Sequence, residues 1–374
     1  MTVPTVPSVR FALATEKNDA AIRQLLRENP TRGRISLSFE HEPDYFRSTQ
    51  MPGTASQTIV GFLHGKLIGV GRCTFRQCHL NGQVRRVGYL SELRLAASVQ
   101  GRFDILRRGY QFFRELHRAD PADFYFTSIA ADNERSLRFL ERNLPGMPAY
   151  KFAADFVTLV IPVARRRHRQ KTGLTSAGLK FMAGNDARLT QLVSFLNLQA
   201  VQNQLAAFWT GDDLLALKDF GLALPDFQLI LDGNDSIVAG AALWDQRSFK
   251  QNVVRDYAAK ISMVRPLINL SAKLLGTVHL PSVGSTLNIG FISPLSANDL
   301  QSALALIESL LSQAAGRGLE FLTLGLAEND ARLTAVRRQF HAREYKTRLY
   351  QVMWDKSEAA VLDDRPFLPE VAFL

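Results

Sequence analysis

The segment GYLSELRLAASVQGRFDILRRGYQFFREL (residues 88–116) combines a strand, a loop and a helix. Residues 89–95 form an apolar strand pattern with the carboxylate of Glu92 at its centre. A small, polar loop covers residues 96–102, and residues 103–116 have apolar side chains at helical spacing. Free backbone N–H groups and the helix dipole make such a loop-to-helix junction a good anion site. A carboxylate upstream of an anion site indicates group transfer from a phosphate-bearing donor.

The composition is that of a folded protein with two domains. The chain has 374 residues, of which 46% are hydrophobic and 21% are charged, and it carries a net charge of +10. The positive charge favours acidic ligands but is equally compatible with ordinary solubility. Cys73 and Cys78 provide no disulfide framework, which fits a reducing, cytoplasmic location. No signal peptide or transmembrane segment is expected, and the oligomeric state stays open.

Outside the central segment, the apolar patterns predict further strands and helices. Asn81-Gly82 is a hairpin turn signal that leads into the central strand. Residues 31–56 are irregular and polar, and they are either a surface loop or a substrate-facing segment. We predict strands at 9–14, 58–63, 66–75, 124–129 and 150–163, and helices at 15–27 and after Asp132 or Asn133.

The second half of the chain repeats motifs of the first half in the same order. Asn18-Asp19-Ala20 recurs at 185–187, and the sequence at 66–71 resembles that at 236–241. Matches in fixed order at a nearly constant offset indicate a duplicated module. The second copy has extra residues at 247–276, whose apolar spacing predicts an additional helix. We therefore expect an N-terminal module at 1–163, a basic linker at 164–176, a second module at 177–355 and a tail at 356–374.

At Leu93-Arg94-Leu95 and Gln100-Gly101-Arg102 the chain resembles the GNAT acyltransferases. The core signature of that family is a strand ending in Leu-Arg-Val or similar, then Gln/Arg-x-x-Gly-x-Gly/Ala, then a helix. The later glycines of the signature are replaced here by Phe103 and Ile105. The resemblance implies an α/β (α+β) fold of two tandem modules, each a mixed, mostly antiparallel sheet flanked by helices. It also implies acetyl-CoA or another acyl-CoA as donor substrate, and no metal.

The resemblance assigns a donor site to the first module. The backbone of the central strand would pair with the pantetheine arm, and the loop and helix start would wrap the pyrophosphate. Asn133, with Ser136 in the same helical turn, would contact the donor; Asn133 is equally a plain helix cap. The donor-binding residues implied in this way are Leu93, Arg94, Leu95, Gln100, Gly101, Arg102, Phe103, Asp104, Ile105, Asn133 and Ser136.

Acyl transfer to an amine needs a proton acceptor, because an alkyl ammonium has a pKa of about 10. Glu92 is the expected general base, directly or through water. The alternative is a structural ion pair between Glu92 and Arg94 or another arginine. The family often uses a tyrosine as acid for the departing thiolate, but the matching position here is Leu140. Tyr150 and Ser91 are the substitute candidates.

The second copy lacks the chemical groups of the first. Aligning Leu93-Arg94-Leu95 with Phe291-Ile292-Ser293 places Gly290 opposite Glu92. The following loop, 293–298, contains neither glycine nor a basic residue. We therefore expect the second module to lack donor binding and to contribute structure or part of the acceptor wall, together with residues 31–56 and 247–276.

These observations predict an acyl-CoA-dependent N-acyltransferase whose acceptor is a small-molecule or peptide amine. One alternative is a transferase of the Fem type or of the N-myristoyltransferase type, which moves an aminoacyl or a long-chain acyl group. Another is a protein without catalytic activity that binds acyl-CoA or a partner. The basic run 165–171 is either a solvated linker or a contact for acidic groups. It has no interleaved aromatic residues, which argues against nucleic acid.

Overall fold

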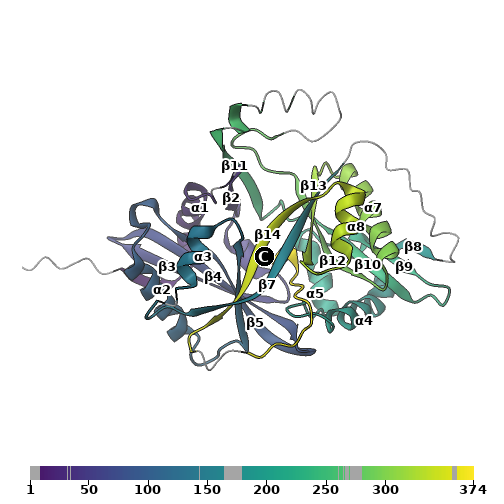
Figure 1. Cartoon of the computed structure of the whole chain (residues 1–374), viewed down its shortest axis with the longest axis horizontal. Coiled ribbons are helices and arrows are strands. Elements are labelled where there is room, and N and C mark those ends of the chain that lie inside the picture. Colours follow the sequence, from purple (N-terminus) through teal and green to yellow (C-terminus); the bar gives the residue numbers. More distant parts are fainter. Residues whose placement is uncertain are drawn as a thin grey trace, which may run out of the picture.

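The computed structural model describes residues 9–374 except 32, 34, 143, 164–178, 260, 264, 266–268, 270–279 and 356–359. Within these residues, twelve strands form one continuous sheet, and two further strands form a small second sheet. Figure 1 shows the first half of the chain on one side of the molecule and the second half on the other. The predicted basic linker, 164–176, lies outside the described residues.

The first module follows the predicted order of elements, except that the segment 31–56, expected to be irregular, contains a strand at Ile35–Glu40 and a 3-10 helix at Phe46–Gln50. The predicted turn between its two longest neighbouring strands is present, because Asn81 and Gly82 have φ angles of 50° and 76°. The elements are β1 (Arg10–Leu13), η1 (Glu16–Asn18), α1 (Asp19–Glu28), β2 (Ile35–Glu40), η2 (Phe46–Gln50), β3 (Thr54–Leu63), β4 (Lys66–Leu80), β5 (Gln83–Leu95), η3 (Ala97–Val99), α2 (Phe103–Leu116), β6 (Phe124–Ala130), α3 (Glu134–Leu140) and β7 (Ala149–Pro162).

The second module repeats this order with two differences: short helices between 211 and 226 take the place of β2 and η2, and one strand, at Gln251–Tyr257, is inserted before the central strand. The elements are β8 (Lys180–Ala183), η5 (Asp186–Arg188), α4 (Leu189–Ala200), α5 (Gly211–Ala216), η6 (Leu217–Phe220), η7 (Leu224–Asp226), β9 (Phe227–Leu231), β10 (Ile237–Trp244), β11 (Gln251–Tyr257), β12 (Ile289–Ala297), α7 (Leu300–Gly316), β13 (Phe321–Ala327), α8 (Arg332–Phe340) and β14 (Arg343–Met353), followed by η9 (Val371–Phe373) in the tail.

The prediction of helix across the insertion was wrong for its first part. Val253 and Tyr257 are four residues apart, as on one face of a helix, but both lie in strand β11. β11 pairs antiparallel with β2, so that Val254 faces Leu37. Backbone pairing with a distant segment therefore overrides the local spacing. Much of the remaining insertion, including 266–268 and 270–279, lies outside the described residues.

The large sheet has a symmetric strand order, β1-β3-β4-β5-β6-β14-β7-β13-β12-β10-β9-β8. The closing strands are exchanged between the modules, because β14 lies between β6 and β7, and β7 pairs with β13. Only β5–β6 and β12–β13 are parallel pairs among the described strands. The predicted fold, two tandem modules with mixed, mostly antiparallel sheets flanked by helices, is confirmed.

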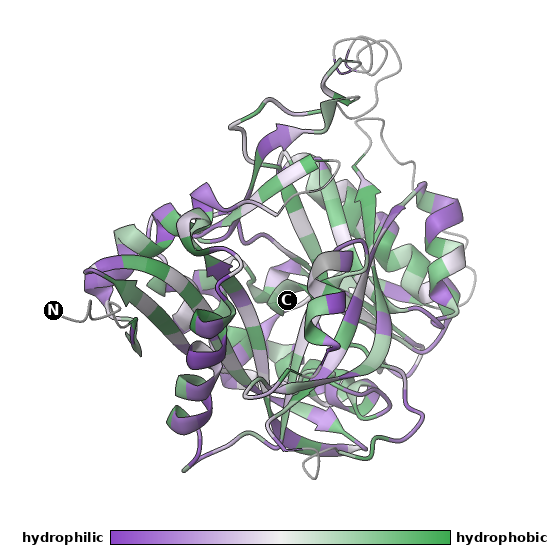
Figure 2. Cartoon of the chain, turned by 60° about the vertical axis from the view of Figure 1, so that its left-hand side comes forward, coloured by the Kyte–Doolittle hydropathy of each residue, from purple (hydrophilic) through white to green (hydrophobic). Residues whose placement is uncertain are grey.

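The middle of the sheet forms the core that joins the two modules. Phe156, Val157, Leu159 and Ile161 of β7 have no exposed surface. Figure 2 shows mainly hydrophobic residues along these central strands and more hydrophilic residues on the outer helices. Truncation of such a side chain, for example Leu159→Ala, typically costs about 2–5 kcal/mol of folding free energy. This core is therefore shared by the two modules.

The strand directions place opposite ends of the two central strands at one edge of the sheet. Between β5 and β12 the sheet contains one parallel step at each end and three antiparallel steps in the middle. β5 and β12 are therefore antiparallel, and the carboxyl end of β5 lies at the same edge as the amino end of β12. No helix in the described part of the chain is long and apolar enough to cross a membrane.

Candidate active site

Glu92 lies on a β-bulge in the central strand of the first module. Between the pairs Arg72–Ser91 and Val70–Arg94, β5 contains one residue more than β4. Glu92 has a φ angle of 55°, which places a residue other than glycine in the left-handed region. This conformation costs about 1–3 kcal/mol and persists only where the surroundings hold it. The bulge turns the Glu92 side chain out of the regular alternation of the strand.

The Glu92 carboxylate is surrounded by three polar side chains. The His41 Nε2 atom is 2.8 Å from Glu92 Oε1, and the Tyr45 hydroxyl donates to Oε2 at 2.8 Å. A guanidinium nitrogen of Arg72 is 3.3 Å from Oε1. Only 16% of the Glu92 side chain is exposed, so these contacts satisfy a nearly buried charge. The partner of Glu92 is thus Arg72 rather than Arg94.

These contacts determine the protonation states of Glu92 and His41. Burial alone would raise the pKa of Glu92, but Arg72, His41 and the hydrogen bonds of His41 and Tyr45 together lower it well below its ordinary value. Burial lowers the pKa of His41, although Glu92 opposes this shift. Glu92 is therefore ionised and His41 neutral at pH 7. Because a carboxylate only accepts, His41 carries its proton on Nε2 and a lone pair on Nδ1.

A second layer of hydrogen bonds holds the arginine and the tyrosine in place. Arg72 donates from Nε to the Tyr45 hydroxyl at 3.1 Å and from Nη2 to Ser48 Oγ at 3.0 Å. Tyr45 and Thr58 share a hydrogen bond of 3.1 Å. Tyr45 has no exposed surface. Because each member is satisfied by another, the network orients the Glu92 carboxylate rigidly.

His41 Nδ1 is the exception in this network. It is buried and has no hydrogen-bond partner in the described protein. Buried polar atoms without a partner are rare in folded proteins, and each one calls for an explanation such as a bound ligand or water. His41 Nδ1 is therefore the atom of the network that retains capacity to accept a proton.

The second module contributes the opposite wall. Lys250, between β10 and β11, donates from Nζ to the Leu374 backbone oxygen at 2.9 Å. Burial lowers the pKa of Lys250 to about 8, Glu92 opposes the shift and Arg72 adds to it. The same Nζ atom lies 6.0 Å from the centre of the Phe291 ring on β12. The segments expected to form the acceptor wall also meet here, since β2 pairs with β11.

The edge of β5 that faces β6 is paired over only a short stretch. β5 and β6 pair only at residues 87–89, and farther along the Thr127 hydroxyl donates to the Leu90 carbonyl at 2.8 Å. The side chain of Leu93 is 42% exposed. One guanidinium nitrogen of Arg94 donates to the Leu93 carbonyl at 2.9 Å. The amino acids that the resemblance assigned to the pantetheine arm therefore line an incompletely paired strand edge.

The bulky residues of the phosphate loop do not fill it. Phe103 packs its ring against Phe139 of α3, with the ring centres 6.0 Å apart. Ile105 is 1% exposed and packs with Ile68 and Val99 in the core. Gly101 has a φ angle of 87°, and its Cα faces open space. The two side chains that replace the family's glycines thus point away from the loop backbone.

An internal carboxylate occupies the start of α2. Arg102 donates from Nε to Asp104 Oδ1 at 2.8 Å and from Nη2 to Oδ2 at 2.7 Å. The hydrogen bond from Arg102 and the nearby backbone N–H groups lower the pKa of Asp104 to about 2. Both side chains are exposed, at 49% and 45%. A diphosphate at this helix end would compete with Asp104 for the same donors.

The remaining predicted residues lie outside the Glu92 cluster. Asn133 caps α3, because its Oδ1 atom accepts from the Ser136 backbone N–H at 3.2 Å. The Gln100 side chain is exposed and donates to Asn29 Oδ1 at 3.4 Å. The Tyr150 hydroxyl donates to the Tyr110 hydroxyl at 2.6 Å. Burial raises the pKa of Tyr150. A donor contact for Asn133 and an acid role for Tyr150 stay predictions.

His41, Tyr45 and Lys250 were missed by the sequence analysis. His41 and Tyr45 lie in the irregular segment 31–56, Lys250 lies in the insertion at 247–276, and the chain separates His41 from Glu92 by 51 positions. The signal that existed was compositional, since His41 stands between two glutamates in an otherwise polar stretch. No group of three or more His, Cys, Asp or Glu side chains is placed to hold a metal ion among the described residues.

The second module has the same bulge with different side chains. Between the pairs Leu243–Ile292 and Ala241–Leu295, β12 contains one residue more than β10. Ser293 therefore occupies the position of Glu92, and the alignment of Gly290 with Glu92 was wrong. An alignment of apolar residues does not determine register, whereas the bulge does.

Comparison with known proteins gives structural but no sequence-level relatives. No protein-family model and no curated protein matches the sequence. A GCN5-related N-acetyltransferase from Sphaerobacter thermophilus is 13% identical with a TM-score of 0.54, over 93% of this chain and 96% of that one. N-myristoyltransferase from Saccharomyces cerevisiae with bound myristoyl-CoA is 10% identical with a TM-score of 0.59, over 97% and 89%.

A third similar structure is a GCN5-related glucosamine N-acetyltransferase region of a fungal multi-domain β-N-acetylglucosaminidase. It is 11% identical with a TM-score of 0.60, over 93% of this chain and 38% of that one. At these identities the likeness concerns the fold. The resemblance drawn from the central strand and loop is thereby confirmed, and the chain has the GNAT fold in a tandem arrangement.

Proposed function

We propose that this chain is an acyl-CoA-dependent N-acyltransferase whose N-terminal module carries the chemistry. The observation that supports it most is Glu92, held on a strained bulge against His41, beside an incompletely paired strand edge. Strained backbone and shifted pKa values cluster at functional sites. The similar yeast structure contains myristoyl-CoA, which supports a coenzyme A thioester as donor.

The donor would lie along β5 and end at the start of α2. The amides of the pantetheine arm would pair with the backbone of Leu93 and Leu95. The pyrophosphate would meet the backbone N–H groups of the loop at 100–105, where Gly101 leaves open space. Arg102 would turn from Asp104 to the phosphates. Asn133 and Ser136, at the start of α3, would contact the donor from the neighbouring element.

In the chemical step, the amine nitrogen of the acceptor attacks the thioester carbonyl carbon. A nitrogen–carbon bond forms, the carbon–sulfur bond breaks, and coenzyme A leaves as a thiolate. The proton released by the amine passes to His41 Nδ1, directly or through one water, and then to the thiolate or solvent. Nδ1 is shielded in the free protein, so the acceptor or a water must displace the packing over it.

This assignment divides the roles between two residues. The predicted role of Glu92 as general base stays a prediction, but its lowered pKa makes it a weak proton acceptor. The carboxylate instead keeps the proton of His41 on Nε2 and favours the imidazolium that forms during the reaction. Arg72 and Tyr45 hold the carboxylate in that orientation. Glu92 then acts as a positioning residue for His41.

The second module would supply the acceptor wall. Lys250, whose pKa is affected by Glu92 and Arg72, lies near the Phe291 ring, and Ser293 replaces the carboxylate at the second bulge. The similar structures bear the names of enzymes with different acceptors, so their likeness selects none of these acceptors. The acceptor class we propose is a small-molecule or peptide amine.

The direct test is release of free coenzyme A from acetyl-CoA and from longer acyl-CoA esters in the presence of a panel of amines. The proposal predicts amine-dependent release and a product of matching mass. Acyl-CoA binding without release for any amine would leave a non-catalytic acyl-CoA-binding protein. Absence of acyl-CoA binding, with salt-sensitive binding of tRNA, would favour the Fem-type alternative.

A further inference from the structure

The segment 41–45, which carries two members of the Glu92 cluster, lies between β2 and η2. The backbone ladder of β2 and β11 ends at the pair Glu40–Gln251, so the segment continues beyond the last strand pair. A connection of this kind takes its conformation from the hydrogen bonds that its backbone groups make. The position of His41 beside Glu92 therefore depends on the partners of residues 41–45.

The side chain of Gln251 extends the ladder by one more step. Its Oε1 atom accepts from the Glu42 backbone N–H at 2.9 Å, and its Nε2 atom donates to the Glu42 carbonyl at 2.9 Å. A side-chain amide presents the same donor and acceptor as a peptide group, so Gln251 takes the place of a further strand residue. Glu42 directly follows His41 in the chain. The second module thus holds the residue next to the proposed proton acceptor.

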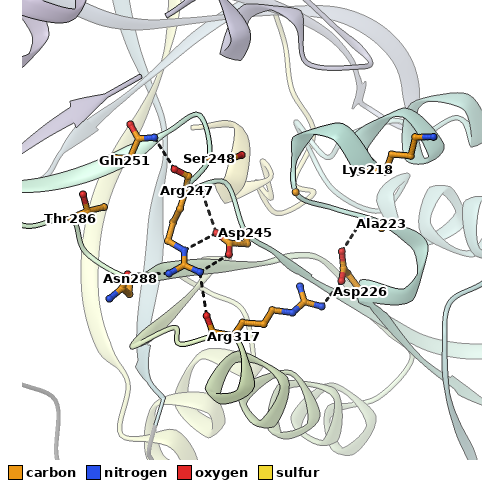
Figure 3. A pocket seen from close by; sticks show the side chains of 11 residues that line it. Lys218, Ala223, Asp226, Asp245, Arg247, Ser248, Gln251, Thr286, Asn288 and Arg317 are labelled. Atoms are coloured by element: carbon orange, nitrogen blue, oxygen red, sulfur yellow. Dashed lines mark hydrogen bonds and ion pairs between the residues drawn. The ribbon is translucent and has the colours of Figure 1, made fainter. Parts of the chain in front are cut away.

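The Gln251 amide is itself held in one orientation. It also donates to the Arg247 backbone oxygen at 2.7 Å, as Figure 3 shows. The Arg247 side chain donates to Asp245 at 2.9 and 2.7 Å and to Asn288 at 3.0 Å. Rotation of the amide by half a turn would place its oxygen against two carbonyl oxygens, so the alternative orientation is unfavourable. Gln251 therefore holds Glu42 from a fixed support.

A second side chain holds the other end of the segment. Asp19, the first residue of α1, accepts from the Tyr45 backbone N–H at 2.8 Å. The same carboxylate accepts from Arg23 at 2.9 and 2.7 Å, and Arg23 also pairs with the Glu42 carboxylate. In the second copy of the repeated Asn-Asp-Ala motif, the equivalent Asp186 is exposed. In the first module, the motif thus helps to anchor the segment that carries Tyr45.

Gln251 also lies between the Glu42 backbone and solvent. It is part of the wall of an open pocket of about 700 Å³ in the second module (Figure 3). The side chain of His41, by contrast, is only 2% exposed. Loss of the Gln251 amide would leave the N–H and carbonyl groups of Glu42 to bond with water from the pocket. The conformation of the segment would then no longer be fixed from the second module.

We propose that Gln251 is a positioning residue for His41, because its amide holds the 41–45 segment so that the imidazole lies against Glu92. The inference rests on the proposed function and gives the second module a part in the chemistry of the first. Rates of group transfer depend steeply on placement, since a displacement of about 1 Å can cost about 100-fold. A hydrogen bond from another module can therefore control the rate without touching the substrate.

The first test requires no activity. It is the NMR titration of the His41 imidazole in the full chain, assigned by the signal that His41→Ala removes. The charged or titratable groups around His41 are Glu92 of β5, Arg72 of β4, Lys250 between β10 and β11, and Tyr45 of its own segment. Gln251→Met retains all four and nearly matches the length of glutamine, but it lacks the amide. Burial lowers the pKa of His41, so a released segment should let this pKa rise toward its ordinary value of 6.5.

His117, at the end of α2, is the internal control for the fold. Burial also lowers the pKa of His117, which lies away from the 41–45 segment and bonds to Phe113 and Gln57. Its titration should be the same in Gln251→Met as in the native protein. Gln251→Ala, which shortens the side chain as well, should raise the pKa of His41 in the same direction.

The second test separates turnover from binding. Gln251→Met should lower kcat for the acylation of an amine about 10- to 100-fold. The Kd for acyl-CoA should change less than about threefold, because the donor would lie along β5. Gln228→Met is the matched control, since Gln228 of β9 bonds to the Phe227 carbonyl and the Ser309 hydroxyl, outside the site. It should leave both kcat and Kd unchanged.

An unchanged pKa of His41 in Gln251→Met, or an equal rise in the pKa of His117, would overturn the inference. Equal kcat values in Gln251→Met and Gln228→Met would overturn it as well and would leave the transferase intact. A chain that releases no coenzyme A with any amine would refute the proposed function. A rise confined to the pKa of His41 would even then support placement of His41 by Gln251.

Discussion

The two modules share a β-bulge in the central strand but differ in the side chains that surround it. Both central strands carry a bulge at the equivalent position, occupied by Glu92 in β5 and by Ser293 in β12. Glu92 contacts His41, Tyr45 and Arg72, whereas Ser293 donates to Glu370 of the C-terminal segment at 2.5 Å. The bulge alone is therefore not evidence of chemistry, and the side chains around it decide the role.

The two modules also differ in what lies beside the bulge, in the gap where the central strand is no longer paired with the next parallel strand. In both modules the parallel strand pair stops after three residues, at Tyr89 and at Phe291. In the second module the gap is closed, because residues 368–371 of the C-terminal segment lie against β12 and β13. Ser293 is fully buried there, while Leu93 at the first bulge is 42% exposed. In the second module the chain itself thus fills the space beside the central strand that stays exposed at Leu93 in the first module.

The largest effect should come from removing the proposed proton acceptor. His41→Ala should lower kcat/KM by about 10²–10⁴-fold, the usual contribution of a positioned base. Binding of acyl-CoA should stay within about threefold, because His41 lies on the acceptor side of the bulge. Ser293→Ala, at the equivalent bulge, is the matched control and should change kcat/KM by less than about threefold. Equal losses of kcat/KM in both variants would contradict the claim that only the first module carries the chemistry.

The two buried carboxylates should differ in their contribution to stability. Glu92→Gln should lower the free energy of unfolding by about 3 kcal/mol, because Arg72 is left as an uncompensated buried charge. Glu370→Gln should change it by less than about 1 kcal/mol, since burial raises the pKa of Glu370 and the amide can still accept from Ser293. Urea unfolding measures both values.

The difference in the free energy of unfolding between the native protein and Glu92→Gln should also depend on pH. The pKa of Glu92 in the folded protein lies below its ordinary value of 4.5, so the ionised carboxylate stabilises the fold at every pH above that value. The stabilisation is lost as pH falls through the lower, folded pKa. The difference in unfolding free energy between the native protein and Glu92→Gln should therefore become smaller below about pH 4.5. A gap that stays constant down to the acid transition would contradict the ion-pair account.

The acidic limb of the profile of kcat/KM against pH should reflect the pKa of His41. Burial lowers the pKa of His41 below its ordinary value of 6.5, so kcat/KM should be constant near neutrality and fall only at a more acidic pH. Glu92 raises this pKa, so Glu92→Gln should move the acid limb to still lower pH. Complete loss of activity in Glu92→Gln, with no shifted limb, would restore Glu92 as the general base.

The smallest effect concerns the helix that follows each central strand. Asp104→Asn should tighten acyl-CoA binding about two- to fivefold, because it removes an anion that competes at the start of α2. Asp299, the cap of α7 in the second module, accepts from the Ser302 backbone at 2.8 Å. Asp299→Asn should leave acyl-CoA binding unchanged in a fluorescence or calorimetric titration. Tighter binding in both variants would argue for a donor groove in each module.

The sequence was sufficient for those parts of the fold that depend on local patterns. The strand, loop and helix at 88–116 and the turn at Asn81-Gly82 follow from periodicity and turn chemistry, and repeated motifs indicated the duplication. The exchange of β7 and β14 had no local signal, because periodicity does not select a strand's neighbour. β11 appeared helical for the same reason: its partner, β2, lies more than two hundred residues away.

The candidate site was predictable in part. Glu92 stood out as a carboxylate inside an apolar strand, and its pairing with an arginine other than Arg94 was among the alternatives. His41 could not be assigned, because its place beside Glu92 results from the packing of the 41–50 segment on β5. The orientation of Phe103 toward Phe139 likewise depends on tertiary contacts, which no loop signature encodes.

The most direct test of the central claim is calorimetric titration of the full chain with acetyl-CoA and with longer acyl-CoA esters. The account predicts one binding site per chain, since the groove beside β5 is incompletely paired and that beside β12 is filled by residues 368–371. Two equivalent sites per chain, or no heat with any ester, would contradict it.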